Sequence, residues 1–155
     1  MEERNMKRIL TALLALAMIF SLAACTGSIG ASSDYKVAMV TDYGDITDQS
    51  FNQTTYEACK AFCEAEGLAF EYFKPATDSD DDRIAMIENA IDSGYNVVVL
   101  PGFAFANAII ATADEYPEVK FVALDVSEFD LTGNGWTIPE NVYSAVYQEE
   151  ISGYF

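Results

Sequence analysis

The sequence contains no histidine, and this absence removes whole classes of chemistry. Without histidine the chain has neither a Ser-His-Asp or Cys-His catalytic arrangement nor a mixed Cys/His zinc site. Basic residues are also scarce, at 8 against 25 acidic ones, which gives a formal net charge of −17. Such a charge disfavours binding to phosphate backbones and anionic headgroups. Nucleic acid is therefore excluded as a partner, and the acidity is most simply a solubility feature.

Cysteine is nearly absent as well, with three residues in the chain. Cys59 and Cys63 are four positions apart on one face of an expected helix, beside Thr55, Ala58 and Phe62. This spacing disfavours an unstrained disulfide. We expect both to be small core residues.

The sequence has no apolar run long enough to cross a bilayer as a helix. The apolar run near the N-terminus extends over residues 9–22, 14 positions where a span needs ~20. It follows the basic residues Arg4, Lys7 and Arg8 and leads to Leu22, Ala23, Ala24 and Cys25. A basic region, a short apolar region and small residues before a cleavage point indicate a secretory signal peptide.

Cys25, at the end of that signal, resembles the lipidated cysteine of the bacterial lipoprotein lipobox. The resemblance implies a diacylglyceryl group on Cys25, and two acyl chains are enough for stable anchoring. We expect a signal peptide over 1–24, a lipidated cysteine with a Gly- and Ser-containing tether over 25–34, and one globular lobe over 35–155. The alternative is a buried core helix with an incidental cysteine.

Strand-like and helix-like segments alternate along the globular part. Strands are expected over 36–41, 69–74, 96–100, 120–124 and 142–147. Helices are expected over 50–66, over 80–93 and from the residues after Gly102 to Tyr116, with another beginning at Gln148. This alternation predicts an α/β fold with a doubly wound parallel sheet and right-handed crossovers. In such sheets, ligands bind outside the carboxyl ends of the strands, so the loops after Thr41, Leu100 and Leu124 are the ones to search.

The loop after the first expected strand carries Asp42, Gly44, Asp48, Ser50, Phe51 and Asn52. With the segments 101–105 (PGFAF), 116–125 (YPEVKFVALD) and 141–154 (NVYSAVYQEEISGY), it resembles the basic membrane protein family. These are purine-nucleoside-receptor-like lipoproteins that serve ABC transporters as substrate-binding proteins. The resemblance implies the first lobe of a type I periplasmic-binding-protein-like fold, here incomplete.

The same resemblance places the positions of Asp42, Phe51 and Asn52 at the base end of the ligand site, and Asp125 near the ligand. The residue types suit these places. A phenyl ring stacks on a nucleobase, an amide offers a donor and an acceptor to a base edge, and a carboxylate accepts protons from two ribose hydroxyls. Phe103 is a further candidate. None of these roles breaks a bond, so we expect no enzyme, no cofactor and no metal.

Each candidate also has a purely structural alternative. The alternatives are a first core residue of the helix for Phe51, a solvated first-turn residue for Asn52, a turn former for Asp42, a loop cap for Asp125, and a core position for Phe103 as for Phe105. We expect Asp48 and Ser50 to cap the following helix, because their oxygens can accept its unpaired amide protons.

Three other kinds of site are excluded by their patterns. A calcium loop over Asp78, Asp80 and Asp82 would need glycine where Arg83 stands and glutamate where Asn89 stands. A dinucleotide fingerprint needs three glycines after the first strand, and that turn has only Gly44. A phosphate-binding P-loop is absent from the sequence.

These observations predict a lipid-anchored, extracytoplasmic solute-binding component of an ABC transporter, with a nucleoside as solute and a permease as partner. The alternatives are a sugar or another small solute, or a sensory lipoprotein that signals to a membrane receptor. The resemblance covers only the first of two lobes. We therefore expect a truncated product that exposes apolar surface and binds solute weakly or not at all.

Overall fold

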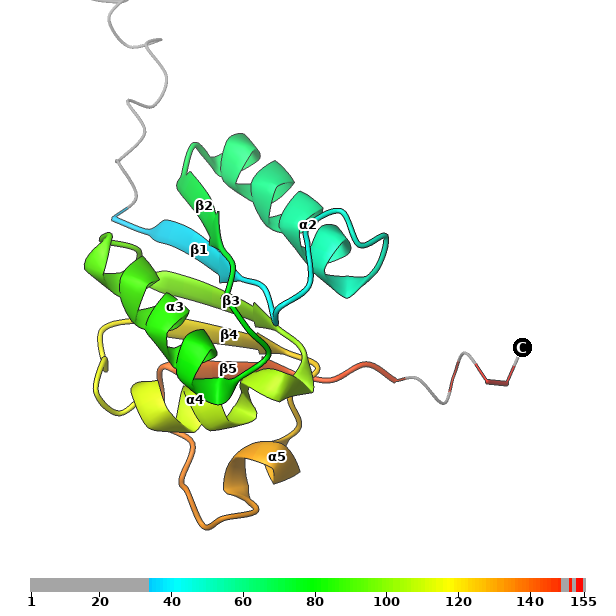
Figure 1. The fold of residues 1–155 in the computed structure, drawn as a ribbon, viewed down its shortest axis with the longest axis vertical. Coiled ribbons are helices and arrows are strands. Elements are labelled where there is room, and N and C mark those ends of the chain that lie inside the picture. Colours follow the sequence, from blue (N-terminus) through cyan, green and yellow to red (C-terminus); the bar gives the residue numbers. More distant parts are fainter. Residues whose placement is uncertain (1–33, 149–150, 152, 155) are drawn as a thin grey trace, which may run out of the picture. The chain divides into compact units, whose positions relative to one another are not determined.

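Five strands form one parallel sheet in the computed structural model, which describes residues 34–148, 151, 153 and 154. The strands are β1 (Lys36–Val40), β2 (Ala69–Phe73), β3 (Val97–Pro101), β4 (Lys120–Leu124) and β5 (Val142–Ala145). Their order is β2-β1-β3-β4-β5, and every neighbouring pair is parallel (Figure 1). The predicted α/β fold with a parallel sheet is confirmed.

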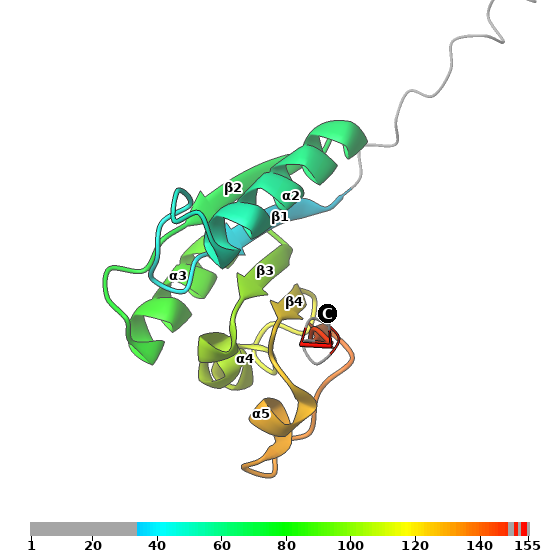
Figure 2. The same cartoon turned by 90° about the vertical axis from the view of Figure 1, so that its right-hand side faces the viewer.

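Helices cover both faces of this sheet (Figures 1 and 2). On one face lies α2 (Phe51–Glu66), whose buried Cys63 packs with Val37 and Val99. On the other face lie α3 (Asp80–Asp92) and α4 (Ala106–Thr112), whose residues Ile87 and Ile109 share a core cluster with Val98 and Leu100. Alternate residues of β3 therefore face opposite helical layers, as in a doubly wound sheet.

The structure differs from the sequence expectation by more than one residue in three places. The third helix ends at Thr112 rather than Tyr116, and the 3-10 turn η2 (Phe103–Phe105) precedes it. The last strand ends at Ala145, two residues early. The loop before it holds a short helix, α5 (Glu128–Thr132), that was not expected.

Several expectations concern residues outside the described part of the chain. The signal peptide, Cys25 and the tether through Ser33 lie there entirely, and the helix expected from Gln148 lies there in part. Within the described residues, no helix combines the length and the hydropathy that a bilayer span requires.

The strand order fixes where a ligand would sit. From β1 the chain passes through α2 to β2 on one side of β1, and then through α3 to β3 on the other side. The loops after β1 and β3 therefore diverge at the carboxyl edge, and such a divergence opens a crevice in doubly wound sheets. The candidate site is expected between these two loops.

Candidate functional site

The loop after β1 is held together by the side chain of Asn52, the second residue of α2. Asn52 is only 5% exposed. Its Nδ2 donates to Asp42 Oδ1 at 2.9 Å and to Asp48 Oδ2 at 3.0 Å, and its Oδ1 accepts from the Asp42 amide at 3.4 Å. The alternative of a solvated first-turn residue is therefore wrong, because the amide group is fixed between two carboxylates.

Asp42 shapes the turn that follows β1. Its Oδ1 accepts from the amides of Tyr43 at 2.6 Å and Gly44 at 2.7 Å, so the turn-forming role is real. Partial burial raises the pKa of Asp42, but the amides of Gly44 and Tyr43, the Asn52 side chain and the charge of Arg83 together outweigh it and lower this pKa below its usual value. Asp42 is therefore an ionised carboxylate at neutral pH.

The start of α2 is capped by Asp48 and not by Ser50. Asp48 Oδ1 accepts from the amides of Ser50 at 2.8 Å and Gln53 at 3.2 Å. Ser50 occupies the N-cap position, yet its side chain makes no capping hydrogen bond. The expectation of capping by Ser50 is wrong, since the Gln53 amide donates instead to Asp48, two residues upstream of Ser50.

Aromatic rings lie along the same edge. Phe51, the first residue of α2, is half-buried, and its ring meets that of Tyr147 at a centroid distance of 5.8 Å and an interplanar angle of 77°. Phe103 begins η2 and is 71% exposed, whereas Phe105 is fully buried. The predicted core position is thus confirmed for Phe105 and wrong for Phe103, whose ring is exposed to solvent.

Asp125 directly follows β4, and its backbone is strained. Its φ of 60° lies in the left-handed region, which a non-glycine residue adopts at an energetic cost. Its amide donates to the Ala145 carbonyl at 2.7 Å, and the Gly102 amide donates to the Leu124 carbonyl at 2.7 Å. The loop after β3 and the ends of β4 and β5 are thus joined at one edge.

The structure therefore brings Asp42 and Asn52 into direct contact and sets Phe51 next to Asn52 in the chain. Phe103 and Asp125 lie on the same edge of the sheet, after β3 and β4. Among the described residues, no hydrogen bond or ring contact joins their side chains to the other three. Sequence reasoning missed Tyr147 and the buried Arg83. The sequence signal for Arg83 was its position directly after three acidic residues, which we used only to exclude a calcium loop.

The three aspartates of that excluded calcium pattern have protein partners instead. Asp78 and Asp80 accept hydrogen bonds from the Arg83 guanidinium. Asp82 accepts from the Thr77 hydroxyl. No cluster of three or more potential metal ligands occurs among the described residues.

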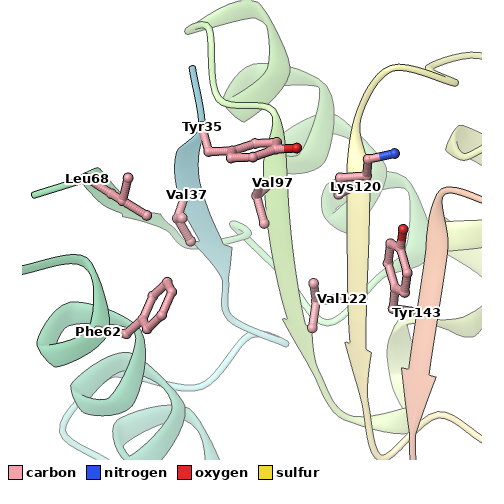
Figure 3. Close-up of a pocket in the computed structure, with 8 residues that line it drawn as sticks. All are labelled: Tyr35, Val37, Phe62, Leu68, Val97, Lys120, Val122 and Tyr143. Atoms are coloured by element: carbon pink, nitrogen blue, oxygen red, sulfur yellow. The ribbon is translucent and has the colours of Figure 1, made fainter. Parts of the chain in front are cut away.

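An apolar groove lies away from the candidate residues, on the α2 face of the sheet (Figure 3). Val37, Val97, Val122 and Tyr143 rise into it from β1, β3, β4 and β5, with Phe62 of α2 on one side. Phe62 is 57% exposed. The reason is that α2 packs mainly over β2, β1 and β3 and leaves the β5 end of this face open.

Cys59 lines an adjoining apolar pocket on the same face and is only partly buried, while Cys63 is buried beneath α2, and both thiols are free. Burial, with a smaller contribution from Cys63, raises the pKa of the Cys59 thiol to about 11. Both cysteines are therefore protonated, weakly reactive groups at neutral pH.

Comparison with known proteins identifies the family of the chain. A family model described as ABC transporter substrate-binding protein PnrA-like (Bmp) matches residues 35–155. The ABC transporter nucleoside-binding protein BmpA of Lactococcus lactis is 29% identical over 151 residues, which cover 91% of this chain and 40% of that protein. An uncharacterised lipoprotein of Pyrococcus furiosus is 28% identical over 139 residues, covering 88% and 33%.

A crystal structure titled as ABC transporter solute-binding proteins from Aeropyrum pernix matches with a TM-score of 0.63 and 25% identity, over 75% of this chain and 29% of that one. The chain spans about a third to two fifths of the length of the curated relatives compared with it. The relatives include lipoproteins, and the structural likeness is to a periplasmic-binding-protein-like fold, as the sequence resemblance implied. The chain belongs to the Bmp family of PnrA-like ABC transporter substrate-binding proteins.

Proposed function

We propose that this chain supplies the first lobe of a lipid-anchored receptor that delivers a nucleoside, most simply a purine nucleoside, to an ABC permease outside the cytoplasm. The carrying observation is the fixed Asp42 and Asn52 pair at the switch point of the sheet, next to the Phe51 ring. One carboxylate and one oriented amide suit the edge of a base, and the ring suits its face. The name of the Lactococcus relative agrees with this ligand class.

The intramolecular hydrogen bonds of Asn52 limit which of its side-chain atoms can bind a solute. Both Nδ2 protons are engaged by Asp42 and Asp48, and Oδ1 meets the Asp42 amide only at 3.4 Å. The side-chain Oδ1 of Asn52 and the remaining lone pairs of Asp42 would therefore accept hydrogen bonds from the base edge. Asp125, on the same edge, would accept the ribose hydroxyls, and Phe103 is free to cover the solute from the loop after β3.

The second lobe of the complete protein would close over this edge, since family proteins clamp solute between two lobes by hinge closure. With one lobe, only part of the contacts can form, and binding is expected to be weak. The test must therefore detect weak binding and also locate it.

The test is an NMR titration of the isotopically labelled full chain, in detergent micelles, with adenosine, uridine, ribose and glucose in turn. Amide shifts on adenosine addition should concentrate in residues 42–52, at Gly102 and Phe103, and at Asp125. Phe51→Leu should weaken the response by the equivalent of ~1–3 kcal/mol, the range for stacking on one base. Phe62→Leu, at the other end of the same helix, is the matched control. A response to sugars without one to nucleosides would refute the proposal and favour a sugar receptor.

The anchor is proposed separately and is tested in cells. A palmitate analogue should label the wild-type chain and Cys59→Ser but not Cys25→Ser, and only Cys25→Ser should leave the membrane fraction. Labelling that persists in Cys25→Ser would show that this cysteine is not the lipidated residue.

A further inference from the structure

Arg83 is a buried cation at the carboxyl edge that has no part in the proposed contacts with solute. It lies in the first turn of α3 and is 5% exposed. Its guanidinium donates to Asp78, and NH1 donates to Asp80 Oδ1 at 3.2 Å. A buried charge is costly unless it is paired, so these two carboxylates account for how the cation can be held there.

The same cation reaches the loop that carries Phe103. The guanidinium carbon lies 5.9 Å from the centroid of the Phe105 ring, within the range of a cation–π contact. A second link runs beside it, because Asn107 Nδ2 donates to Asp80 Oδ2 at 2.9 Å. Two contacts thus join the first turn of α3 to the segment that begins at Gly102, where φ is 114° and the chain turns sharply.

Arg83 also acts on the loop after β1. Its positive charge is one of the influences that favour the ionised form of Asp42. The other polar groups around Asp42 are the amides of Tyr43 and Gly44, Asn52 of α2, which bonds it directly, and Asp48, which shares the Asn52 amide. The charge of Arg83 is the smallest of the influences that lower the pKa of Asp42.

Two buried atoms in this region are left without hydrogen bonds. Among the described residues, Thr41 Oγ1 and Arg83 Nε are buried side-chain atoms with no hydrogen-bond partner. Thr41 immediately precedes Asp42. A buried donor left unpaired lowers stability, so the position of Arg83 is not the one that maximises hydrogen bonding.

We propose that Arg83 is a positioning residue of the candidate site: a buried cation that fixes the Phe103 loop against the start of α3. It acts on the solute through that loop and not by direct contact. The inference rests on the proposed function of the edge, but the order it describes can be measured without any solute.

The first test follows the carboxyl carbons of Asp42 and Asp45 by NMR through an acid titration of the full chain in micelles. Asp45 is the internal reference, because Thr47 and Lys74, not Arg83, are what lower its pKa. Arg83→Gln should raise the Asp42 midpoint and leave Asp45 unchanged, and Arg83→Lys should restore most of the wild-type midpoint. Lys74→Gln, which removes the 3.1 Å ion pair with Asp45, should raise the Asp45 midpoint and leave the Asp42 midpoint unchanged.

The second test follows the Phe103 amide by ¹⁵N relaxation. Arg83→Gln should increase its mobility, and so should the surface variant Asn107→Ala, which removes the second link without touching the charge. Asn107→Ala should not move the Asp42 midpoint. An unchanged Phe103 amide in both variants would overturn the inference, and equal Asp42 midpoints in wild type and Arg83→Gln would show that the charge of Arg83 does not act on Asp42. Should Arg83→Gln fail to fold, Arg83→Lys and Asn107→Ala decide the question alone.

The solute arm separates this inference from the proposed function. If adenosine shifts the wild-type amides, Arg83→Gln should reduce the shifts at residues 42 and 103 several-fold at equal concentration, and Lys74→Gln should not. An unchanged response in Arg83→Gln would overturn the inference even if adenosine binds. If no nucleoside or sugar shifts any amide, the proposed function fails, and the positioning role is decided by the two solute-free readouts.

Discussion

At the scale of single residues, the loop after β1 depends on Gly44, a residue without a side chain. A Cβ at Gly44 would lie 2.6 Å from Asn52 Nδ2 and 3.1 Å from Asp42 Oδ1. Neither neighbour can withdraw freely, because Asn52 Nδ2 is bonded to both Asp42 and Asp48. The glycine is thus required by the close approach of the Asn52 amide.

We predict that Gly44→Ala separates Asn52 from Asp42. The new methyl group takes the space of the amide, so a buried polar group loses its partners at a cost of roughly 1–3 kcal/mol. Urea unfolding measures this cost, and the Asn52 side-chain NH₂ resonances should move toward their solvent-exposed positions. Unchanged NH₂ resonances would show that the loop adapts without breaking the pair.

Asp48 and Ser50 provide a second prediction, because only one of them caps α2. Asp48→Ala removes the acceptor of the Ser50 and Gln53 amides and should lower the free energy of unfolding by ~0.5–2 kcal/mol. Ser50→Ala removes a side chain that makes no capping bond and should change it by less than about 0.5 kcal/mol. Equal effects in urea unfolding would contradict this assignment.

At the scale of the elements, α5 depends on its N-cap residue, Ser127. Ser127 Oγ accepts from the Asp130 amide at 3.2 Å, and Asp130 Oδ2 accepts from the Ser127 amide at 2.8 Å and from its hydroxyl at 2.6 Å. This reciprocal arrangement satisfies two amides at the helix start. The hydrogen bonds from Ser127 lower the pKa of Asp130.

We predict that Ser127→Ala costs ~0.5–2 kcal/mol at pH 7 and less in acid, where the hydroxyl bond to the ionised Asp130 is lost while the bond from the Asp130 amide remains. The pKa of Asp130 is lowered in the folded state, so its contribution is present above the unfolded value of 3.8 and is lost as the pH falls through the lower folded value. Urea unfolding of both proteins at pH 7 and below pH 3.8 measures the difference. Ser93→Ala is the control, because the backbone of Ser93 supplies its capping hydrogen bonds at the end of α3. A pH-independent cost would mean that Asp130 takes no part.

The sequence predicted the elements with a strong hydrophobic period and missed those set by local polar contacts. All five strands and the long helices α2 and α3 were expected, because each carries a continuous or periodic apolar set in the sequence, although β2 buries none of its residues fully and β5 buries only Val142. The five residues of α5 are too few to show a period, although Ser127 and Asp130 carried its signal. The third helix was drawn too long because its apolar pattern continues through Ala113, where the chain already turns.

The candidate site, too, could be predicted from the sequence only in part. The alternation of strands and helices placed the loops of Asp42, Phe103 and Asp125 on one edge, because parallel strands all end at the same edge of a sheet. The choice between binding and structural roles could not be made from residue types, because Asn52 in water and Asn52 between two carboxylates have the same sequence. Arg83 was missed because burial of a cation depends on tertiary contacts with Phe105 and with the aspartates around it.

At the scale of the whole described lobe, the two faces of the sheet are unequally covered. Val142 and Tyr143 are neighbours in β5 and point to opposite faces. Val142 is 8% exposed and belongs to the core formed with α3 and α4, whereas Tyr143 is 54% exposed in the groove beside α2. An apolar face of this kind is usual where another part of a protein packs, and the relatives are two to three times as long as the matched region.

This asymmetry predicts opposite effects of two adjacent substitutions. Val142→Ser removes buried methyl groups and should cost ~1–3 kcal/mol in urea unfolding, with little effect on binding of a hydrophobic dye. Tyr143→Ser should change stability by less than about 0.5 kcal/mol, yet it should reduce dye binding and concentration-dependent self-association, because the groove loses an exposed ring. If Tyr143→Ser proved as destabilising as Val142→Ser, the face beside α2 would have to be covered by the chain itself.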